Sequence, residues 1–533
     1  MKFKLIIILV LITFHFKAQD RKGQIQLEGN SQSHTLYVSF YPIPEKEQNI
    51  IDYSLNNNVS FRDFIKKNEI SFINDLGFND RKLSEMSQES LKNHPSDESV
   101  QKLRRIFKVK TSQTSNEDLL ALAKNLETFK EIEYATLISN EPIEPPFIQS
   151  EATVTPNLEP NQSYLFTNPG IDVNYAWALG ISGQNVKVRD VEYGFHKSHE
   201  MLTNVNAIQF EPTASLNPQL ADPTSNYYNY LDHGTSVLSI LGSSRDNIGL
   251  SGAIHSAPEI TGFLEWTSNG YDRVNAVSRA INASQAGNII LYEMQTGGQN
   301  SQYVPAEYNN LIWDLTKAAT DAGIIIIAAA GNGNQDLDSP YYYSYMSRGD
   351  SGAIIVGAGS NTITHSKLSF STYGTRVNVQ GWGQNVLAAG YGGWATYDGD
   401  TNRTYNLFNG TSSATPIVAS AAALIQSYYY QKNGQYLNPQ QIKNILISTG
   451  IPQGGNLTQK IGPLPNIRAA LLFLGSQTAK EGENDLEPLT MKVYPNPSSD
   501  YINIESNSSS RNIELEILNT EGQYVIKKSG ILG

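Results

Sequence analysis

The chain has 533 residues, 39% of them hydrophobic and 17% charged, and a formal net charge of −12 at pH 7. This length predicts about three or four domain-sized pieces, and the negative charge argues against nucleic acid as a partner because phosphate groups repel an acidic surface. The sequence contains no cysteine, which excludes disulfide bonds and a cysteine-linked lipid anchor.

A secretion signal peptide is predicted over residues 1–18. Lys2 and Lys4 supply the basic start, and residues 5–14 form an apolar stretch of ten residues, which is too short to cross a bilayer. Cleavage is expected after Ala18. Since no other run approaches spanning length, we expect a mature protein without a transmembrane segment.

Residues 19–148 are predicted to form a small α+β domain. Residues 105–110 and 132–137 have the character of strands, and leucines recur at helical spacing between them, over residues 116–126. A further strand is expected at residues 36–40, whereas residues 42–99 are polar and predict no particular element. Prolines block regular structure between residues 141 and 161, and we expect a linker over residues 149–164.

Residues 165–475 alternate apolar strands with helices, the pattern of an α/β domain with an open parallel sheet. The first strand, residues 186–190, ends in Asp190. Sites in such folds assemble at the carboxyl ends of parallel strands, so Asp190 is the predicted orienting acid. Glu192 and Asp232 are the alternative acids.

His233 is the predicted general base. It opens the run Asp-His-Gly-Thr-Ser-Val-Leu, a polar break that leads into an apolar helix, and Gly234 permits a close approach by backbone or substrate. The other histidines, among them His196, His199 and His365, show no metal-ligand spacing and predict structural roles.

Ser412 is the predicted nucleophile. It lies in Asn-Gly-Thr-Ser-Ser-Ala-Thr-Pro, just before a small-residue run with helical character, and a helix start offers unpaired N–H groups to an oxyanion. No histidine follows Ser412 and no Gly-x-Ser-x-Gly motif occurs, which excludes the α/β-hydrolase order. A helix N-cap is the alternative role for this serine.

The order Asp190, His233, Ser412, with His-Gly-Thr and Gly-Thr-Ser-x-Ala-Thr-Pro, resembles the subtilisin-like (subtilase) serine proteases. The Ala-Ala-Gly-Asn turn at residues 329–332 and the strand with a Gly-Gly edge at residues 289–298 extend the resemblance. It implies a subtilisin-like fold, an open parallel sheet with helices on both faces, and residues 19–148 would then be an inhibitory pro-region.

The resemblance also implies how the domain would act on protein or peptide substrates as a serine endopeptidase. Ser412 would attack the scissile carbonyl, His233 would take its proton, and the Asn332 side chain would complete the oxyanion hole; a turn residue is its alternative role. The expected substrate edge and pocket floor consist of Gln295, Thr296, Gly297, Gly298, Ala329 and Gly331. No cofactor is required. The family is compatible with structural calcium, and residues 398–402 offer clustered oxygens.

Two positions depart from the family pattern. The acid motif usually runs Asp-Thr/Ser-Gly, but this chain has Arg-Asp-Val-Glu-Tyr-Gly over residues 189–194, and residue 295 is glutamine where serine is common. The altered acid motif supports a second interpretation, a subtilase-fold surface protein that binds without cleaving.

After a polar linker at residues 476–488, residues 489–533 predict a short antiparallel β module. Its Tyr-Pro-Asn-Pro segment resembles the C-terminal sorting domains of the type IX secretion route of Bacteroidetes-like bacteria. Four strands are expected, so the module looks truncated. The resemblance implies the type IX machinery as a partner and a secreted or cell-surface location reached through the periplasm. A carbohydrate-binding or adhesive module is the alternative.

Overall fold

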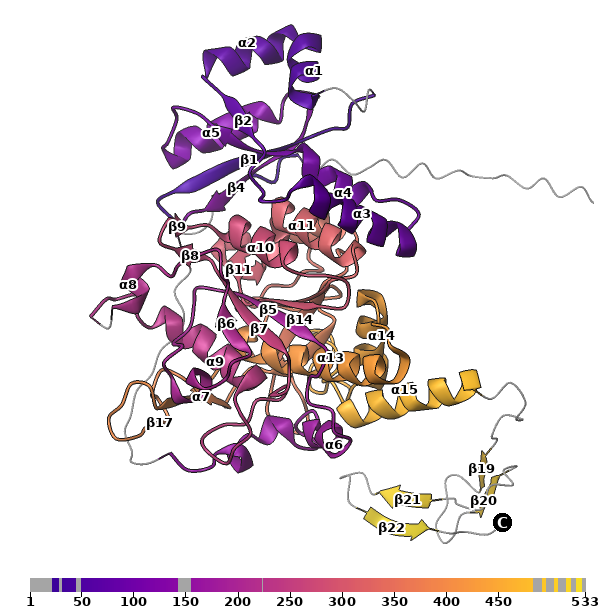
Figure 1. Cartoon of the computed structure of the whole chain (residues 1–533). Helices are drawn as coiled ribbons and strands as arrows, with labels where there is room; N and C mark the ends of the chain where they lie inside the picture. The colour runs from indigo at the N-terminus through magenta and orange to yellow at the C-terminus, as the bar shows by residue number, and fades with distance from the viewer. Residues whose placement is uncertain are drawn as a thin grey trace, which may run out of the picture. The chain divides into compact units, whose positions relative to one another are not determined.

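The computed structural model describes residues 22–27, 31–44, 49–141, 155–222 and 224–482, together with four short strands of the C-terminal segment. The predicted signal peptide and most of the proline-rich tract lie outside these residues. The chain divides into two compact units, Met1–Phe473 and Leu474–Gly533, which are described separately (Figure 1).

A seven-stranded parallel sheet forms the core of the first unit, in the order β15-β14-β13-β10-β5-β7-β6. Its central strands are buried throughout because helices cover both faces, and this explains their nearly continuous apolar sequences. In chain order the strands are β5 (Lys187–Glu192), β6 (Ile208–Phe210), β7 (Glu259–Leu264), β10 (Ile289–Tyr292), β13 (Ile325–Ala329), β14 (Ile354–Gly359) and β15 (Val379–Trp382). The predicted α/β fold is confirmed.

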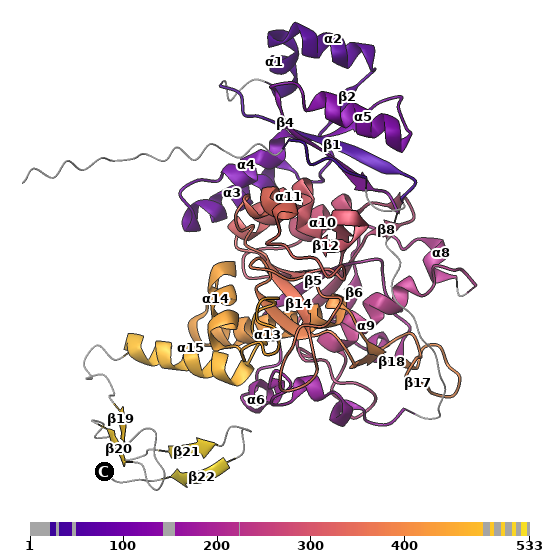
Figure 2. The same ribbon diagram turned by 180° about the vertical axis from the view of Figure 1, so that it is seen from behind.

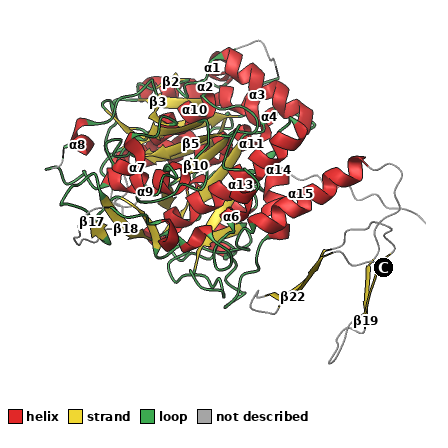
Figure 3. Cartoon of the chain, turned by 60° about the horizontal axis from the view of Figure 1, so that its bottom comes forward, coloured by secondary structure: helices red, strands yellow, loops and turns green. Residues whose placement is uncertain are grey.

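Two pairs of helices cover the sheet. Helices α10 (Arg273–Asn282) and α11 (Asn310–Asp321) pack on one face, and α9 (Tyr230–Gly242) and α13 (Thr411–Asn433) pack against each other on the opposite face (Figures 1 and 2). Figure 3 shows the strands enclosed by these helices. The remaining helices of this domain are α6 (Val173–Ala178), α7 (Glu200–Thr203), α8 (Pro218–Ala221), α12 (Tyr343–Met346) and α14 (Pro439–Thr449), and α15 (Ile467–Gly482) begins in it.

Three small antiparallel sheets lie outside the central one. They are β8 (Trp266–Thr267) with β9 (Gly270–Tyr271), β11 (Gln295–Gly297) with β12 (Tyr303–Pro305), and β16 (Val386–Ala389) with β18 (Thr404–Phe408) and β17 (Ala395–Thr396). Strand β11 follows the carboxyl end of β10, and β18 leads directly into α13, so both sheets border the end of the central sheet where the predicted site residues gather.

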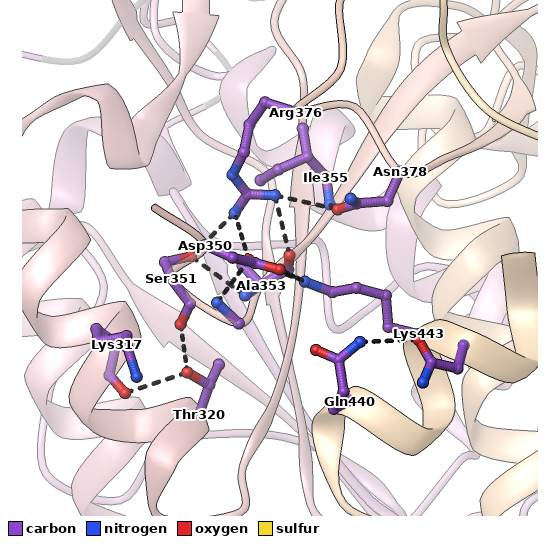
Figure 4. Close-up of polar contacts among 12 residues, drawn as sticks. Lys317, Thr320, Asp350, Ser351, Ala353, Ile355, Arg376, Asn378, Gln440 and Lys443 are labelled. Atoms are coloured by element: carbon purple, nitrogen blue, oxygen red, sulfur yellow. Dashed lines mark hydrogen bonds and ion pairs between the residues drawn. The ribbon is translucent and has the colours of Figure 1, made fainter. Parts of the chain in front are cut away.

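A network of charged side chains, with its two cations buried, anchors the amino end of β14 (Figure 4). Arg376 pairs with Glu307 at 2.8 Å and donates to Oδ1 of Asn378 at 3.1 Å. Lys443 of α14 pairs with Asp350 at 2.7 Å. Each of these buried cations has a carboxylate partner, and the network lies at the end of the strand remote from the predicted site, so its role is structural.

The N-terminal domain has a four-stranded antiparallel sheet in the order β2-β3-β1-β4. The strands predicted at residues 36–40, 105–110 and 132–137 and the helix between them are confirmed. The elements are β1 (His34–Phe40), α1 (Ile50–Asn57), α2 (Val59–Lys67), β2 (Ser71–Ile73), α3 (Asp80–Asn93), α4 (Glu98–Lys102), β3 (Ile106–Lys110), α5 (Asn116–Leu126) and β4 (Ile132–Ser139).

Helices α3 and α4, in a region whose sequence predicted no element, attach this domain to α11. Leu83, Met86 and Val100 share one hydrophobic cluster with Trp313 of α11. The hydroxyl of Tyr134, on β4, donates to Asp314 at 2.6 Å. Short polar helices of this kind gain their stability from packing against another surface, which a periodicity argument cannot supply.

The predicted linkers are partly ordered. Thr155 donates to Oε1 of Glu200 at 2.7 Å, and the backbone N–H of Leu158 donates to the Gly249 carbonyl at 2.7 Å, so the end of the first linker is built into the α/β domain. Helix α15 extends to Gly482, into the second predicted linker. No helix among the described residues is long and apolar enough to cross a membrane.

The second unit contains two antiparallel pairs, β19 (Met491–Tyr494) with β20 (Asn503–Ser506) and β21 (Glu514–Leu518) with β22 (Tyr524–Ser529). The predicted antiparallel character of this segment is confirmed.

Candidate active site

A histidine–carboxylate pair lies where β5 ends beside α9. Nδ1 of His233 is hydrogen-bonded to Oε1 of Glu192, the last residue of β5, and both side chains are buried. The other carboxylate oxygen of Glu192 accepts the backbone N–H of Tyr193 at 2.8 Å. Because a carboxylate can only accept, Nδ1 is the donor in this bond, and the basic nitrogen of a neutral ring would be Nε2.

Two glycines bring these elements into contact. A Cβ on Gly234 would lie 2.2 Å from the carbonyl oxygen of Gly194 and 3.3 Å from Cγ of Glu192. Gly194 itself has a φ of 145°, in the region that side chains rarely adopt. Only glycine at both positions lets the turn after β5 lie against the start of α9, and this contact places Glu192 beside His233.

The structure corrects the predicted acid. Both oxygens of Asp190 are buried without a hydrogen-bond partner, so the residue does not orient His233. Asp190 and Glu192 point to the same face of β5, but only Glu192, at the end of the strand, reaches the ring. The other alternative, Asp232, lies 3.4 Å from Nε2 of His196. The sequence did hold a signal: the family motif has its acid two residues before glycine, and Glu192 is two residues before Gly194.

Ser412 is the second residue of α13, as its sequence context predicted, and only 8% of it is exposed. Helix α13 packs against α9, and the ring of His233 lies 5.3 Å from that of Phe408, at the end of the strand that leads into α13. The structure therefore brings the helix starts that carry His233 and Ser412 to the same end of the sheet.

The amide of Asn332 faces the start of α13. Its Oδ1 accepts the backbone N–H of Thr411 at 2.9 Å and the hydroxyl of Thr411 at 3.0 Å. A Cβ on Gly410 would lie 3.3 Å from Nδ2 of Asn332 and 3.7 Å from the backbone nitrogen of Ser412. The space beside Gly410 is thus bordered by the amide group of Asn332 and by the backbone nitrogen of Ser412.

Two further buried carboxyl groups, those of Asp190 and Glu293, lie near Glu192. Burial raises the pKa of Asp190 well above its ordinary value, and the charges of Glu192 and Glu265 raise it further. Burial likewise raises the pKa of Glu293, next to β10, with Asp190 and Glu192 adding to the shift. Burial also raises the pKa of Glu192, but His233 and the Tyr193 N–H oppose that shift because they favour the carboxylate.

The predicted substrate edge forms β11, which pairs with β12. Its Gln295 and Gly297 carbonyls accept bonds from outside this pair, from Arg273 at 3.0 Å and from Gln26 of the N-terminal domain at 2.6 Å. Thr296 and Ala329 are buried, and the N–H of Gly298 donates to the Gln302 carbonyl at 2.6 Å. A Cβ on Gly331 would lie 2.8 Å from the Val304 nitrogen, so the turn after β13 lies directly against β12.

Two carboxylates of the oxygen-rich loop at residues 398–402, for which no metal ligand was predicted, have partners within the chain. Oδ2 of Asp398 pairs with Arg403, and Oδ1 of Asp400 accepts the backbone N–H of Asn402 at 2.8 Å. Among the described residues, no group of three His, Asp or Glu side chains is arranged to hold a metal ion.

The sequence is similar to known extracellular peptidases. Residues 183–482 match the Subtilase family, and residues 492–531 match the secretion system C-terminal sorting domain. The extracellular basic protease of Dichelobacter nodosus is 26% identical over 384 residues, which are 63% of this chain but only 59% of that protein. Subtilisin of Bacillus pumilus is 30% identical over 297 residues, which are 55% of this chain and 92% of that protein.

One solved structure matches nearly the whole chain. Fervidolysin from Fervidobacterium pennivorans, a keratinolytic enzyme related to subtilisin, aligns with 93% of this chain and 65% of its own chain, with a TM-score of 0.52 and 17% sequence identity. At this identity the likeness concerns the fold alone.

Proposed function

The chain belongs to the subtilase family of serine peptidases, and on this premise we propose that it is a secreted endopeptidase that cleaves peptide bonds through Ser412, His233 and Glu192. The single observation that carries the proposal is the hydrogen bond between Nδ1 of His233 and Glu192. It leaves Nε2 as the base, at the end of the sheet where α13 begins and carries Ser412 as its second residue.

In this mechanism, Nε2 of His233 takes the proton of the Ser412 hydroxyl as its oxygen attacks the scissile carbonyl. Glu192 holds the ring in the productive tautomer and stabilises its positive form. Nδ2 of Asn332 and the N–H of Ser412 donate to the developing oxyanion. The protonated His233 then donates to the leaving amine, and water hydrolyses the acyl-enzyme with the same base.

Substrate would bind as an added strand along β11. The Gly297 carbonyl already accepts a donor from outside the β11–β12 pair, the side chain of Gln26, as a docked peptide backbone would require. Ala329 and Gly331 would line the floor of the side-chain pocket, where a small residue and a glycine leave room for the substrate.

The N-terminal domain would act as an intramolecular inhibitor. Residues 22–27, which we call the N-terminal strap, lie on the substrate edge: Nε2 of Gln26 donates to the Gly297 carbonyl, and Oε1 of Gln24 accepts from Arg348 at 2.7 Å. The strap is tied to its own domain through Lys22, which donates to the Phe129 carbonyl at 2.9 Å. A peptide that needs the Gly297 carbonyl would have to displace Gln26.

The likeness of residues 492–531 to a sorting domain supports export, with the type IX secretion machinery as the partner and a final location outside the cell or on its surface. The mature enzyme would reach it through the periplasm.

A fluorophosphonate probe tests the proposed reaction. The purified mature protein should be labelled at Ser412, and Ser412→Ala and His233→Ala should abolish labelling while leaving the circular dichroism spectrum unchanged. A folded wild-type protein that resists labelling would refute the enzyme and favour the alternative, a subtilase-fold protein that binds without cleaving.

A further inference from the structure

The residue that departs from the family pattern at the substrate edge has a specific contact. Gln295 begins β11, and its half-buried side chain places Oε1 2.9 Å from the backbone nitrogen of Asn332, which donates to it. We propose that Gln295 is a positioning residue that fixes the oxyanion donor of Asn332. This inference rests on the proposed function, because it concerns the same oxyanion site.

Asn332 needs such a constraint because it lies in a turn between two glycines. Gly331 has a φ of 92°, and the peptide that joins it to Asn332 belongs to no strand or helix. The side-chain carbonyl of Asn332 is fixed by Thr411, but those bonds hold only the far end of the residue. The bond from the Asn332 N–H to Gln295 fixes the near end, so that Nδ2 is aimed toward Gly410 from a backbone that is itself held in place.

Gln295 is anchored strongly enough to serve as this support. Its carbonyl accepts from Arg273 at 3.0 Å, and Nε of Arg273 pairs with Glu265 at 2.7 Å. Both charged side chains are buried, and the hydroxyl of Tyr271 donates to the same Glu265 oxygen at 2.5 Å. A buried, hydrogen-bonded ion pair restricts the motion of the residue 295 backbone. Because the Gln295 side chain accepts the Asn332 N–H, it restricts the backbone of Asn332 as well. Serine, the common residue here, is too short to make this bond.

The expected effect falls on turnover. A donor that is displaced by even a fraction of an ångström loses part of its bond to the oxyanion, while the ground-state substrate is bound mainly along β11. We expect Gln295→Met, which keeps the length of the side chain but removes the acceptor, to lower kcat by about tenfold and to change KM by less than about twofold. The affinity for a peptide aldehyde, which forms an oxyanion on the enzyme, should fall in parallel with kcat.

A double-mutant cycle tests whether Gln295 acts through Asn332. We expect Asn332→Ala to lower kcat by about 10²–10³-fold, and Gln295→Met to cost nothing further in that background, because the donor that Gln295 positions is gone. Gln302→Met, the same change at an exposed neighbour before β12, serves as the control and should leave kcat unchanged. If Gln295→Met does not fold, Gln295→Ser provides the same test.

Three outcomes would overturn the inference: a wild-type kcat for Gln295→Met, a loss confined to KM, or additive losses in the double variant. Fluorophosphonate labelling of the wild-type protein separates this failure from that of the proposed function. If Ser412 is labelled but Gln295→Met retains full turnover, Gln295 has no positioning role. If Ser412 is not labelled at all, the proposed reaction itself fails.

Discussion

Replacing Glu192 by glutamine tests the corrected triad most directly, because the structure specifies what the amide would do. In the wild-type chain both carboxylate oxygens accept, one from Nδ1–H of His233 and the other from the Tyr193 N–H. A glutamine has one acceptor and one donor, and so it cannot satisfy both partners. If its oxygen faces Tyr193, its NH₂ group faces Nδ1 and favours the tautomer in which Nε2 carries the proton and cannot act as a base.

The expected loss in kcat for Glu192→Gln is about 10⁴-fold, the effect of the corresponding Asp→Asn change in the chymotrypsin-type triad, which corresponds to about 5.4 kcal/mol of transition-state stabilisation. Turnover of a chromogenic peptide by the mature enzyme, normalised by active-site titration, measures this loss. KM should change little, because neither Glu192 nor His233 belongs to the substrate edge.

Asp190→Asn is the matched control, since it makes the same chemical change two residues earlier on the same face of β5. It should leave kcat within about threefold of the wild type, because Asp190 contacts neither His233 nor any other hydrogen-bond donor. A 10⁴-fold loss in Asp190→Asn with a mild effect in Glu192→Gln would refute the reasoning and restore Asp190 as the acid.

Three further predictions follow from contacts outside the triad. Asp190→Asn and Glu293→Gln should each raise Tm more at pH 8 than at pH 4, because burial raises the pKa of both carboxyls: above about pH 4 the unfolded chain ionises them freely, the native state does not, and native stability falls as the pH rises. A gain in Tm that does not vary with pH would contradict this. Gln26→Ala in the isolated N-terminal domain should weaken its inhibition of the mature enzyme by about tenfold, because the bond to the Gly297 carbonyl is lost; an unchanged inhibition constant would mean that the strap does not compete with substrate. Deletion of residues 489–533 should leave peptide hydrolysis unchanged and retain the enzyme in the periplasm of a host with the type IX machinery, which cell fractionation measures; equal distribution of both forms would mean that the segment is not a sorting signal.

Much of the fold could be predicted from local patterns. Strands β10 and β13 of the parallel sheet are continuous apolar runs, and α13 begins directly after Gly410 in a run of small polar residues, so these elements can be read along the chain. The proposed nucleophile, Ser412, and the proposed base, His233, could be named for the same reason, because each lies in a motif whose residues are adjacent in the sequence. The N-terminal helices α3 and α4 could not be predicted, because their stability comes from packing on α11.

The sequence by itself determined the family, the parallel α/β fold and the places of Ser412, His233 and Asn332. The choice between Asp190 and Glu192 was settled by the tertiary structure. Both side chains point to the same face of β5, and the contact between Gly194 and Gly234 places Glu192 beside the histidine, in agreement with its spacing to Gly194 in the sequence. The bonds of Gln295 to Asn332 and of Gln26 to Gly297 were likewise decided in three dimensions, since they join segments 37 and 271 residues apart. Hydrogen bonds between residues so far apart in the sequence depend on how the strands and loops pack together, and a local sequence pattern cannot predict them.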